Sequence, residues 1–145
     1  MLKVVLDTVV FVRSVISPYG AAGRLVFDRR SYRLFVSGPT VREVLEALTR
    51  SELRRKFRSV ATSDPQAILG ILAHAEVVAP AVIAPICRDP KDDMFLATAV
   101  AAPADYLVSE DRDLLALRAY QGTEIVTVPR MLHILDGLAA PAGDG

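Results

Sequence analysis

Carboxylate side chains follow short apolar runs at several points in this chain of 145 residues. Asp7 ends the run Val4–Leu6, which is too short for a helix and predicts a buried strand. An ionised carboxylate is costly inside a strand buried on both faces, so Asp7 is expected at the carboxyl end of that strand. In open parallel α/β sheets, ligands bind at this edge. The position of Asp7 therefore predicts a site there.

Further acids stand beside a predicted strand end or on the helix that follows it. They are Glu43, Asp92 with its neighbour Asp93, and Asp111. Several carboxylates at one sheet edge raise one another's pKa unless a cation compensates. Hard oxygen ligands suit Mg²⁺ or Mn²⁺, and such a site performs hydrolytic phosphoryl chemistry by orienting and activating water. Only the fold can bring these groups together, because their spacing along the chain is uninformative.

Each acid also has a purely structural interpretation. Asp7 could end a strand or cap a helix, and Asp111 could cap the turn that follows it. Glu43 completes a capping-box pattern with Thr40. Asp92 lies in the first turn of a predicted helix, where acids favour the helix dipole. Taken one at a time, these interpretations stay open.

Strands and helices alternate along the chain. The predicted strands are 4–6, 32–37, 76–78, 105–109 and 124–127. The predicted helices and helical turns are 9–16, 21–30, 40–48, 52–58, 65–75, 90–102, 111–117 and 129–138. Such alternation implies right-handed crossovers and a mostly parallel sheet. The expected fold is one three-layer α/β/α domain over residues 1–138, followed by a flexible tail at 139–145.

The bulk composition is that of an ordinary globular domain, 52% hydrophobic and 23% charged. Lys+Arg and Asp+Glu both number 17, so a nucleic-acid partner would need a local basic patch. The single cysteine, Cys87, excludes an internal disulfide and suits a reducing cytoplasm. No apolar run approaches the roughly 18 residues of a membrane span, and no signal peptide is evident. We therefore expect a soluble cytoplasmic domain with no membrane contact.

Segments in four regions, in order along the chain, resemble those of PIN-domain proteins. They are Leu6–Val10 with Ser17–Gly20, Glu43–Arg50, Arg88–Leu96 and Ala104–Leu115. The resemblance runs nearly end to end and is close to the branch described as toxins of toxin–antitoxin pairs. It implies a central, mostly parallel sheet of five strands, a Mg²⁺ or Mn²⁺ site, and endoribonuclease activity on single-stranded RNA.

Position by position, four acids match the catalytic and metal-binding residues of the family. They are Asp7, Glu43, Asp92 and Asp111. Asp92 is preferred to Asp93 because the acid of the family precedes a small residue by five positions, here Ala97. Ser109 stands where the family has Thr or Ser beside the metal. Our hypothesis is that three aspartates bind the cation and that Glu43 helps hold it or its water.

One position departs from the family pattern, since Val9 stands where an Asn is usual. Loss of an amide that orients the first carboxylate could weaken metal binding. The alternative function is thus a catalytically weak or inactive PIN-fold module that binds RNA or an antitoxin. Expected partners are single-stranded RNA, a cognate antitoxin and further copies of this chain in a homo-oligomer. Candidates for steering phosphates are Arg13, Arg50, Arg54 and Arg112.

Overall fold

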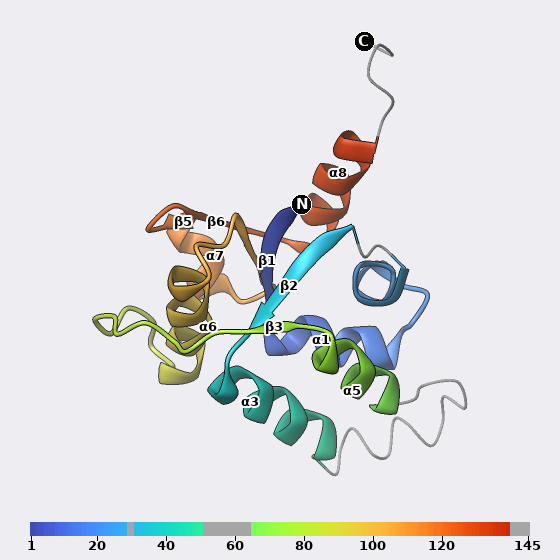
Figure 1. The fold of residues 1–145 in the computed structure, drawn as a ribbon, viewed down its shortest axis with the longest axis horizontal. Coiled ribbons are helices and arrows are strands. Elements are labelled where there is room, and N and C mark those ends of the chain that lie inside the picture. Colours follow the sequence, from blue (N-terminus) through green and yellow to red (C-terminus); the bar gives the residue numbers. More distant parts are fainter. Residues whose placement is uncertain (29–30, 51–64, 140–145) are drawn as a thin grey trace.

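The structure is a computed structural model that describes residues 1–28, 31–50 and 65–139 (Figure 1). In this part of the chain, one six-stranded sheet has the order β3-β2-β1-β4-β6-β5. The strands are β1 (Leu2–Leu6), β2 (Tyr32–Val36), β3 (Glu76–Val77), β4 (Tyr106–Val108), β5 (Ala119–Tyr120) and β6 (Thr123–Val126). The helices are α1 (Thr8–Ile16), α2 (Ala21–Gly23), α3 (Gly38–Thr49), α5 (Pro65–Ala73), α6 (Pro90–Ala101), α7 (Arg112–Leu117) and α8 (Val128–Ala139), with a π-helical turn η1 (Arg24–Asp28).

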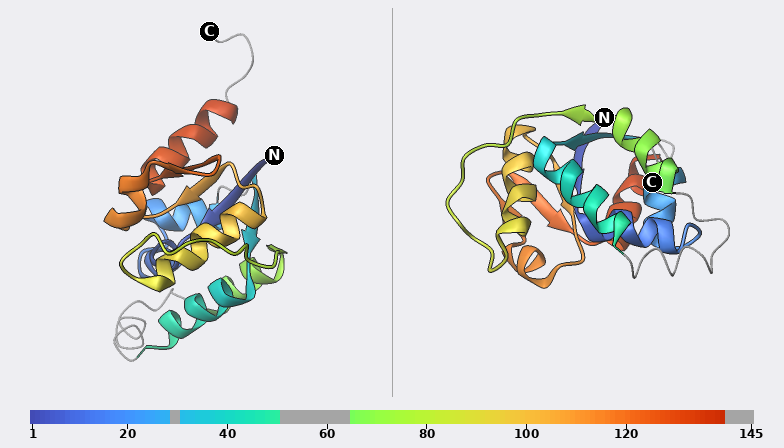
Figure 2. Two further views of the ribbon diagram at one scale, coloured as in Figure 1. Left: turned by 90° about the vertical axis from the view of Figure 1, so that its left-hand side faces the viewer. Right: turned by 90° about the horizontal axis from the view of Figure 1, so that it is seen from below.

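Helices cover both faces of the sheet because side chains of its central strands alternate between two cores. On β1, Val4 and Leu6 belong to the core shared with α1, α5 and α8, whereas Val5 belongs to the core shared with α6 and α7. All three side chains are at most 2% exposed. Figure 2 shows these helices on the two sides of the sheet. The predicted three-layer α/β/α architecture is confirmed.

The order of the strands creates a switch point beside β1. From β1 the chain adds β2 and then β3 on one side, and it later returns to place β4 against the other side of β1. Every pairing is parallel except that of β5 with β6. The chain therefore leaves β1 and β4 in the same direction, and the amide of Asp7 donates to the carbonyl of Val108 at 3.0 Å. Ligands of open α/β sheets bind in the crevice at such a point.

Side-chain caps begin the helices that leave this edge. Asp7 caps α1, Asp89 caps α6 and Asp111 caps α7, each accepting a hydrogen bond from the first turn. Helix α3 has a capping box formed by Ser37 and Thr40. The alternative that pairs Thr40 with Glu43 in a capping box is wrong, because Thr40 is itself the third residue of the helix.

Two predicted elements differ from the observed ones. The short strand β5 adds an antiparallel edge to the five predicted strands, and at two residues it is too short for periodicity to reveal. The predicted helix 21–30 is instead α2 followed by η1. At Gly23 a Cβ atom would lie 2.0 Å from the carbonyl oxygen of Pro18, so this tight approach requires glycine.

The predicted helix 52–58 and most of the tail 139–145 lie outside the described residues. Helix α8 runs to Ala139, one residue beyond the predicted domain boundary. Among the described residues, no helix is both long and apolar enough to cross a membrane.

Candidate active site

Asp7 is a buried carboxylate at the carboxyl end of β1, with 4% of its surface exposed. Its Oδ1 accepts from the amide of Val9 at 2.8 Å, and its Oδ2 accepts from the hydroxyl of Ser109. Burial raises the pKa of Asp7, its two hydrogen bonds act in the opposite direction, and the charges of Asp111 and Glu110 raise it further. Asp7 is both a helix cap and a buried acid facing other acids, so its two interpretations from the sequence are compatible.

Ser109 links the acids that follow β1 and β4. Its buried hydroxyl donates to Asp7 and accepts from the amide of Asp111 at 2.9 Å. Oδ1 of Asp111 in turn accepts from the amides of Asp113 at 2.8 Å and Leu114 at 3.1 Å. These bonds fix both carboxylates before any ligand arrives.

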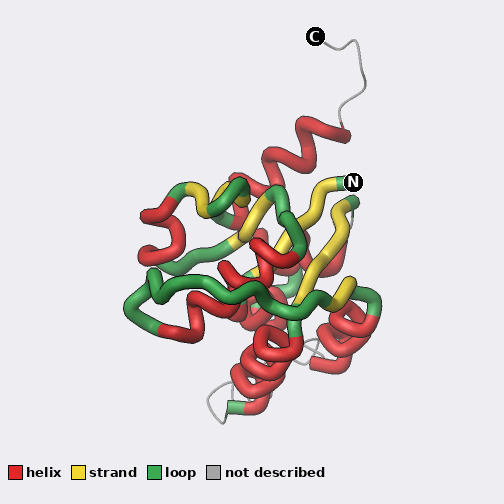
Figure 3. The backbone as a smooth tube through the Cα atoms, turned by 60° about the vertical axis from the view of Figure 1, so that its left-hand side comes forward, coloured by secondary structure: helices red, strands yellow, loops and turns green. Residues whose placement is uncertain are grey.

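Asp92 and Asp93 are adjacent on α6 but have different surroundings. Asp93 accepts from the amides of Ile86 and Cys87, at 2.9 Å for Cys87, and so holds the long loop between β3 and α6 against the helix (Figure 3). Among the described residues, the carboxylate of Asp92 makes no hydrogen bond. Burial raises the pKa of Asp92 to about 7, and the charges of Asp111 and Asp7 contribute. The geometry therefore favours Asp92 over Asp93 as the acid that faces the others.

Glu43 lies on α3 and differs from the three aspartates because cations surround it. Its carboxylate is 3.5 Å from a guanidinium nitrogen of Arg50 and 3.7 Å from Nζ of Lys91. The side chain of Glu43 is 11% exposed, whereas both cations are more than half exposed. Lys91 immediately precedes Asp92, so this ion-paired group adjoins the aspartates. Sequence reasoning missed Lys91, although its position next to an acid of the site was a usable signal.

The oxygen donors at this edge fit a hard divalent cation. The charge of Asp111 raises the pKa of both Asp7 and Asp92, and the charge of Asp7 also raises that of Asp92, so negative charge is concentrated here. Within the described residues, however, no three acidic, histidine or cysteine side chains lie close enough together to enclose an ion jointly. Mg²⁺ binds through one or two carboxylates and keeps several waters, so an open arrangement of this kind suits it.

The two residues after Asp7 differ in their surroundings. Among the described side chains, Thr8 has a buried hydroxyl oxygen with no hydrogen-bond partner. Val9 is 39% exposed and orients Asp7 through its backbone amide. The hydrogen bonds from this amide and from Ser109 therefore hold the first carboxylate, although the usual Asn is replaced by Val9.

The other residues singled out from the sequence fall into different settings. Arg13 lines a pocket beside the acids, and Arg50 pairs with Glu43. Arg112 is exposed on α7, and Arg54 lies outside the described residues. Sequence reasoning did not single out Glu110, which lines the same pocket as Arg13. Its position directly before Asp111 was the available signal.

Comparisons with known proteins agree with this fold. The solved structure of VapBC2 from Rickettsia felis, bound to a DNA fragment from their promoter, is similar with a TM-score of 0.57. The two chains are 10% identical, and the similarity covers 87% of this chain and 98% of that one, which shows the fold. The comparison with curated proteins gives no match. A model of the PIN domain matches residues 3–113, and PIN domains are generally nucleases that use divalent ions. This chain belongs to the PIN-domain family.

Proposed function

We propose that this chain is a metal-dependent endoribonuclease that hydrolyses phosphodiester bonds of single-stranded RNA. The observation that carries the proposal is the repulsion at the switch point of the sheet, where the charge of Asp111 raises the pKa of Asp7 and of Asp92. Such repulsion costs folding free energy, and a bound cation would relieve it. A site of this kind, in a family whose members are generally nucleases, favours hydrolysis of a phosphodiester.

In this proposal, Asp7, Asp92 and Asp111 hold Mg²⁺ or Mn²⁺, and Glu43 helps to hold the ion or its water. When bound, the ion stabilises negative charge on the phosphate and lowers the pKa of a coordinated water. Ser109 keeps the carboxylates after β1 and β4 in place through its two hydrogen bonds.

Glu43 has a second role, which is to position cations. It pairs with Arg50 and with Lys91, which directly precedes Asp92, and in this proposal their exposed charges attract the phosphates of RNA. The chain has no net charge, so this local positive charge matters for binding a polyanion.

We further propose that the protein is the toxin of a type II toxin–antitoxin pair and acts in the cytoplasm. Two observations support this. The structure of VapBC2 has a similar fold. The one cysteine, Cys87, is a free thiol, which suits a reducing compartment. A cognate antitoxin and further copies of this chain are the partners that this function implies.

The test is cleavage of a fluorescently labelled single-stranded RNA with Mn²⁺, compared among three proteins. The wild type should cleave, and Asp7→Asn should lose activity by about 100-fold or more. Glu124→Gln is the matched control, because this exposed acid lies near the amino end of β6, away from the site. Equal cleavage by the wild type and Asp7→Asn would refute the proposal.

The second candidate function, an inactive PIN-fold module that binds RNA or an antitoxin, rests on Val9 in place of the usual Asn. Titration with Mn²⁺ monitored by calorimetry separates the two functions. A nuclease should bind Mn²⁺, and Asp92→Asn should weaken that binding by tenfold or more, about the loss expected for a metal-site residue. RNA binding without measurable Mn²⁺ binding would favour the module.

A further inference from the structure

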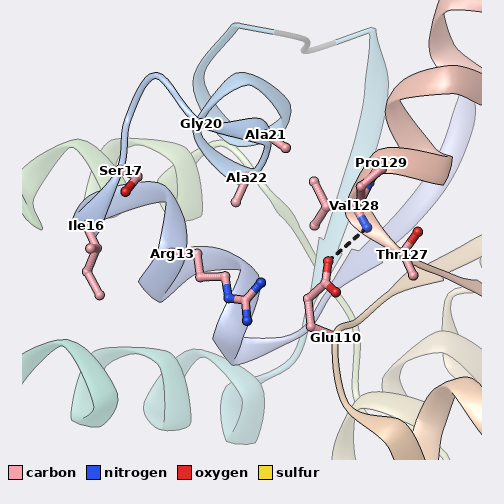
Figure 4. Close-up of a pocket in the computed structure, with 10 residues that line it drawn as sticks. All are labelled: Arg13, Ile16, Ser17, Gly20, Ala21, Ala22, Glu110, Thr127, Val128 and Pro129. Atoms are coloured by element: carbon pink, nitrogen blue, oxygen red, sulfur yellow. Dashed lines mark hydrogen bonds between the residues drawn. The ribbon is translucent and has the colours of Figure 1, made fainter.

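A pocket of about 490 Å³ lies beside the acids, between the end of α1, helix α2 and the start of α8 (Figure 4). Pockets of roughly 300–1,000 Å³ hold small ligands or parts of larger ones. Its apolar wall includes Ile16, Ala22 and Val128. Its polar groups come from Arg13, Ser17, Glu110 and Thr127. The pocket thus combines an apolar wall with a few polar groups that could fix the orientation of a ligand.

Glu110 is the acceptor of the pocket. Its Oε1 accepts from the amide of Val128 at 3.2 Å, which fixes the carboxylate, as Figure 4 shows. Among the described residues, Glu110 has no ion-pair partner, and its Oε2 accepts no hydrogen bond. An ionised carboxylate only accepts hydrogen bonds, so an organic ligand that hydrogen-bonds to it presents N–H or O–H groups.

Arg13 is the cation of the pocket. It reaches into the same gap as Glu110 from α1 (Figure 4), and within the described residues it has no ion-pair partner. Two hydroxyls add donors. Oγ1 of Thr127 already accepts from the amide of Arg130 at 3.2 Å, so its O–H remains to donate. Arg13 can bind a phosphate in a bidentate manner, while a hydroxyl binds a carbonyl oxygen.

Two of the residues that line the pocket connect it to the proposed site of cleavage. Glu110 directly precedes Asp111, and its negative charge raises the pKa of Asp7. Helix α1, which carries Arg13, starts from Asp7 as its cap. A strand of RNA whose phosphate meets the aspartates would therefore place a neighbouring nucleotide at this pocket.

We propose that this pocket binds a guanine nucleotide of the RNA strand next to the cleaved phosphate, an inference that rests on the proposed function. Guanine presents an N1–H and N2–H pair, and the carboxylate of Glu110 accepts both. The O6 of guanine accepts from Thr127 or Ser17, and Arg13 binds a phosphate. Uracil offers a single N–H, and the Watson–Crick edge of adenine offers one donor beside an acceptor, so both match Glu110 less well.

The test is binding of the four nucleoside 5′-monophosphates to the full chain in EDTA, monitored by NMR of labelled protein. Guanosine monophosphate should shift the signals of Glu110 and Arg13 and bind at least about fivefold more tightly than uridine monophosphate. No turnover is needed, so this result is independent of cleavage. Cleavage of RNA without a guanine preference would overturn the proposal for the pocket, whereas the proposed nuclease function would still hold.

Two variants sharpen the test. Glu110→Gln keeps an acceptor for the amide of Val128 but gains a donor, so it should lose the guanine preference and bind adenosine monophosphate better. Arg13→Gln should weaken the binding of all four nucleotides alike. Arg33→Gln, which removes a charge from β2 instead, should leave the binding of all four unchanged.

An unchanged preference in Glu110→Gln would overturn the proposal. So would the absence of shifts in Glu110 and Arg13 with guanosine monophosphate. In the latter case, a segment of an antitoxin becomes the occupant to test.

Discussion

Two groups of charged residues flank the same sheet and behave in opposite ways. At the pairing of β2 with β3, the exposed Arg33 and Glu76 form a close ion pair. The hydrogen bond with Arg33 lowers the pKa of Glu76. At the carboxyl ends of β1 and β4, Asp7 and Asp111 are coupled to Asp92 of α6, and the pKa values of Asp7 and Asp92 are raised, mainly by burial.

This contrast separates charges that suit the folded chain from charges that need a further partner. An exposed ion pair is complete in itself and contributes little to stability. The aspartates are buried or half-buried beside like charges, so they lower the stability of the chain in the absence of a cation. Such conflicts between local rules and the fold are expected at functional sites.

The largest effect should come from Asp92→Asn. We expect loss of RNA cleavage by about 100-fold or more, together with higher thermal stability of the metal-free protein at pH 8, because one repelling charge is removed. The matched control is its neighbour, Asp93→Asn, which perturbs hydrogen bonds to two amides and should lower stability by about 1 kcal/mol or more. Thermal unfolding in EDTA and a cleavage assay measure both. A lower stability of Asp92→Asn than of the wild type would contradict the view that Asp92 is repelled by its neighbours in the folded chain.

Ser109→Ala should have the next largest effect. Removing the hydroxyl takes a hydrogen bond from Asp7 and leaves the amide of Asp111 without its acceptor, so stability should fall by about 1–3 kcal/mol. Affinity for Mn²⁺ should fall by roughly tenfold, because the first carboxylate is no longer oriented. Ser109→Thr keeps the hydroxyl and should retain most of the affinity. Denaturant unfolding and Mn²⁺ titration check this, and wild-type affinity in Ser109→Ala would argue against the bridging role.

A smaller effect is expected in the pH dependence of stability without metal. The pKa of Asp92 rises from an ordinary value of 3.8 to about 7 in the folded protein, so the folded state binds this proton more tightly than the unfolded state. The contribution of Asp92 to stability is therefore complete below about pH 4 and is lost as the pH rises to about 7. Urea unfolding between pH 4 and 8 should show this fall, and Asp92→Asn should flatten it. An identical profile in the variant would assign the pH dependence to other groups.

The smallest effect should come from Arg33→Gln. The ion pair with Glu76 is exposed, so its loss should leave the unfolding midpoint near that of the wild type. RNA cleavage should be unchanged, because Arg33 lies near the amino end of β2, opposite Lys3 of β1, at the other end of the strands from Asp7. The unfolding midpoint and the rate of RNA cleavage are measured in parallel with those of Asp92→Asn. A loss of activity similar to that of Asp92→Asn would remove the distinction between the two groups.

Prediction from the sequence worked best where a local pattern has one structural meaning. The run before Asp7 predicted a buried strand, and the Asp89-Pro90 start predicted helix α6, which Asp89 caps. It failed for β5, because two residues carry no usable period, and for 21–30, because Gly23 packs against the carbonyl of Pro18 in the turn between α1 and α2, a contact that periodicity does not reveal. The capping-box interpretation of Glu43 also failed, because two caps fit the local pattern and the structure uses Ser37.

The sequence by itself determined the alternating strands and helices and the presence of an acid at the relevant strand ends. These follow from hydrophobic periodicity and capping, which act over a few residues. Only the tertiary structure decided that Asp93 accepts hydrogen bonds from the loop before α6, that Ser109 joins two strands, and that Glu110 shares a pocket with Arg13. The reason is physical, because burial, repulsion between charges and pocket shape depend on residues that are distant in the chain and adjacent only after it folds.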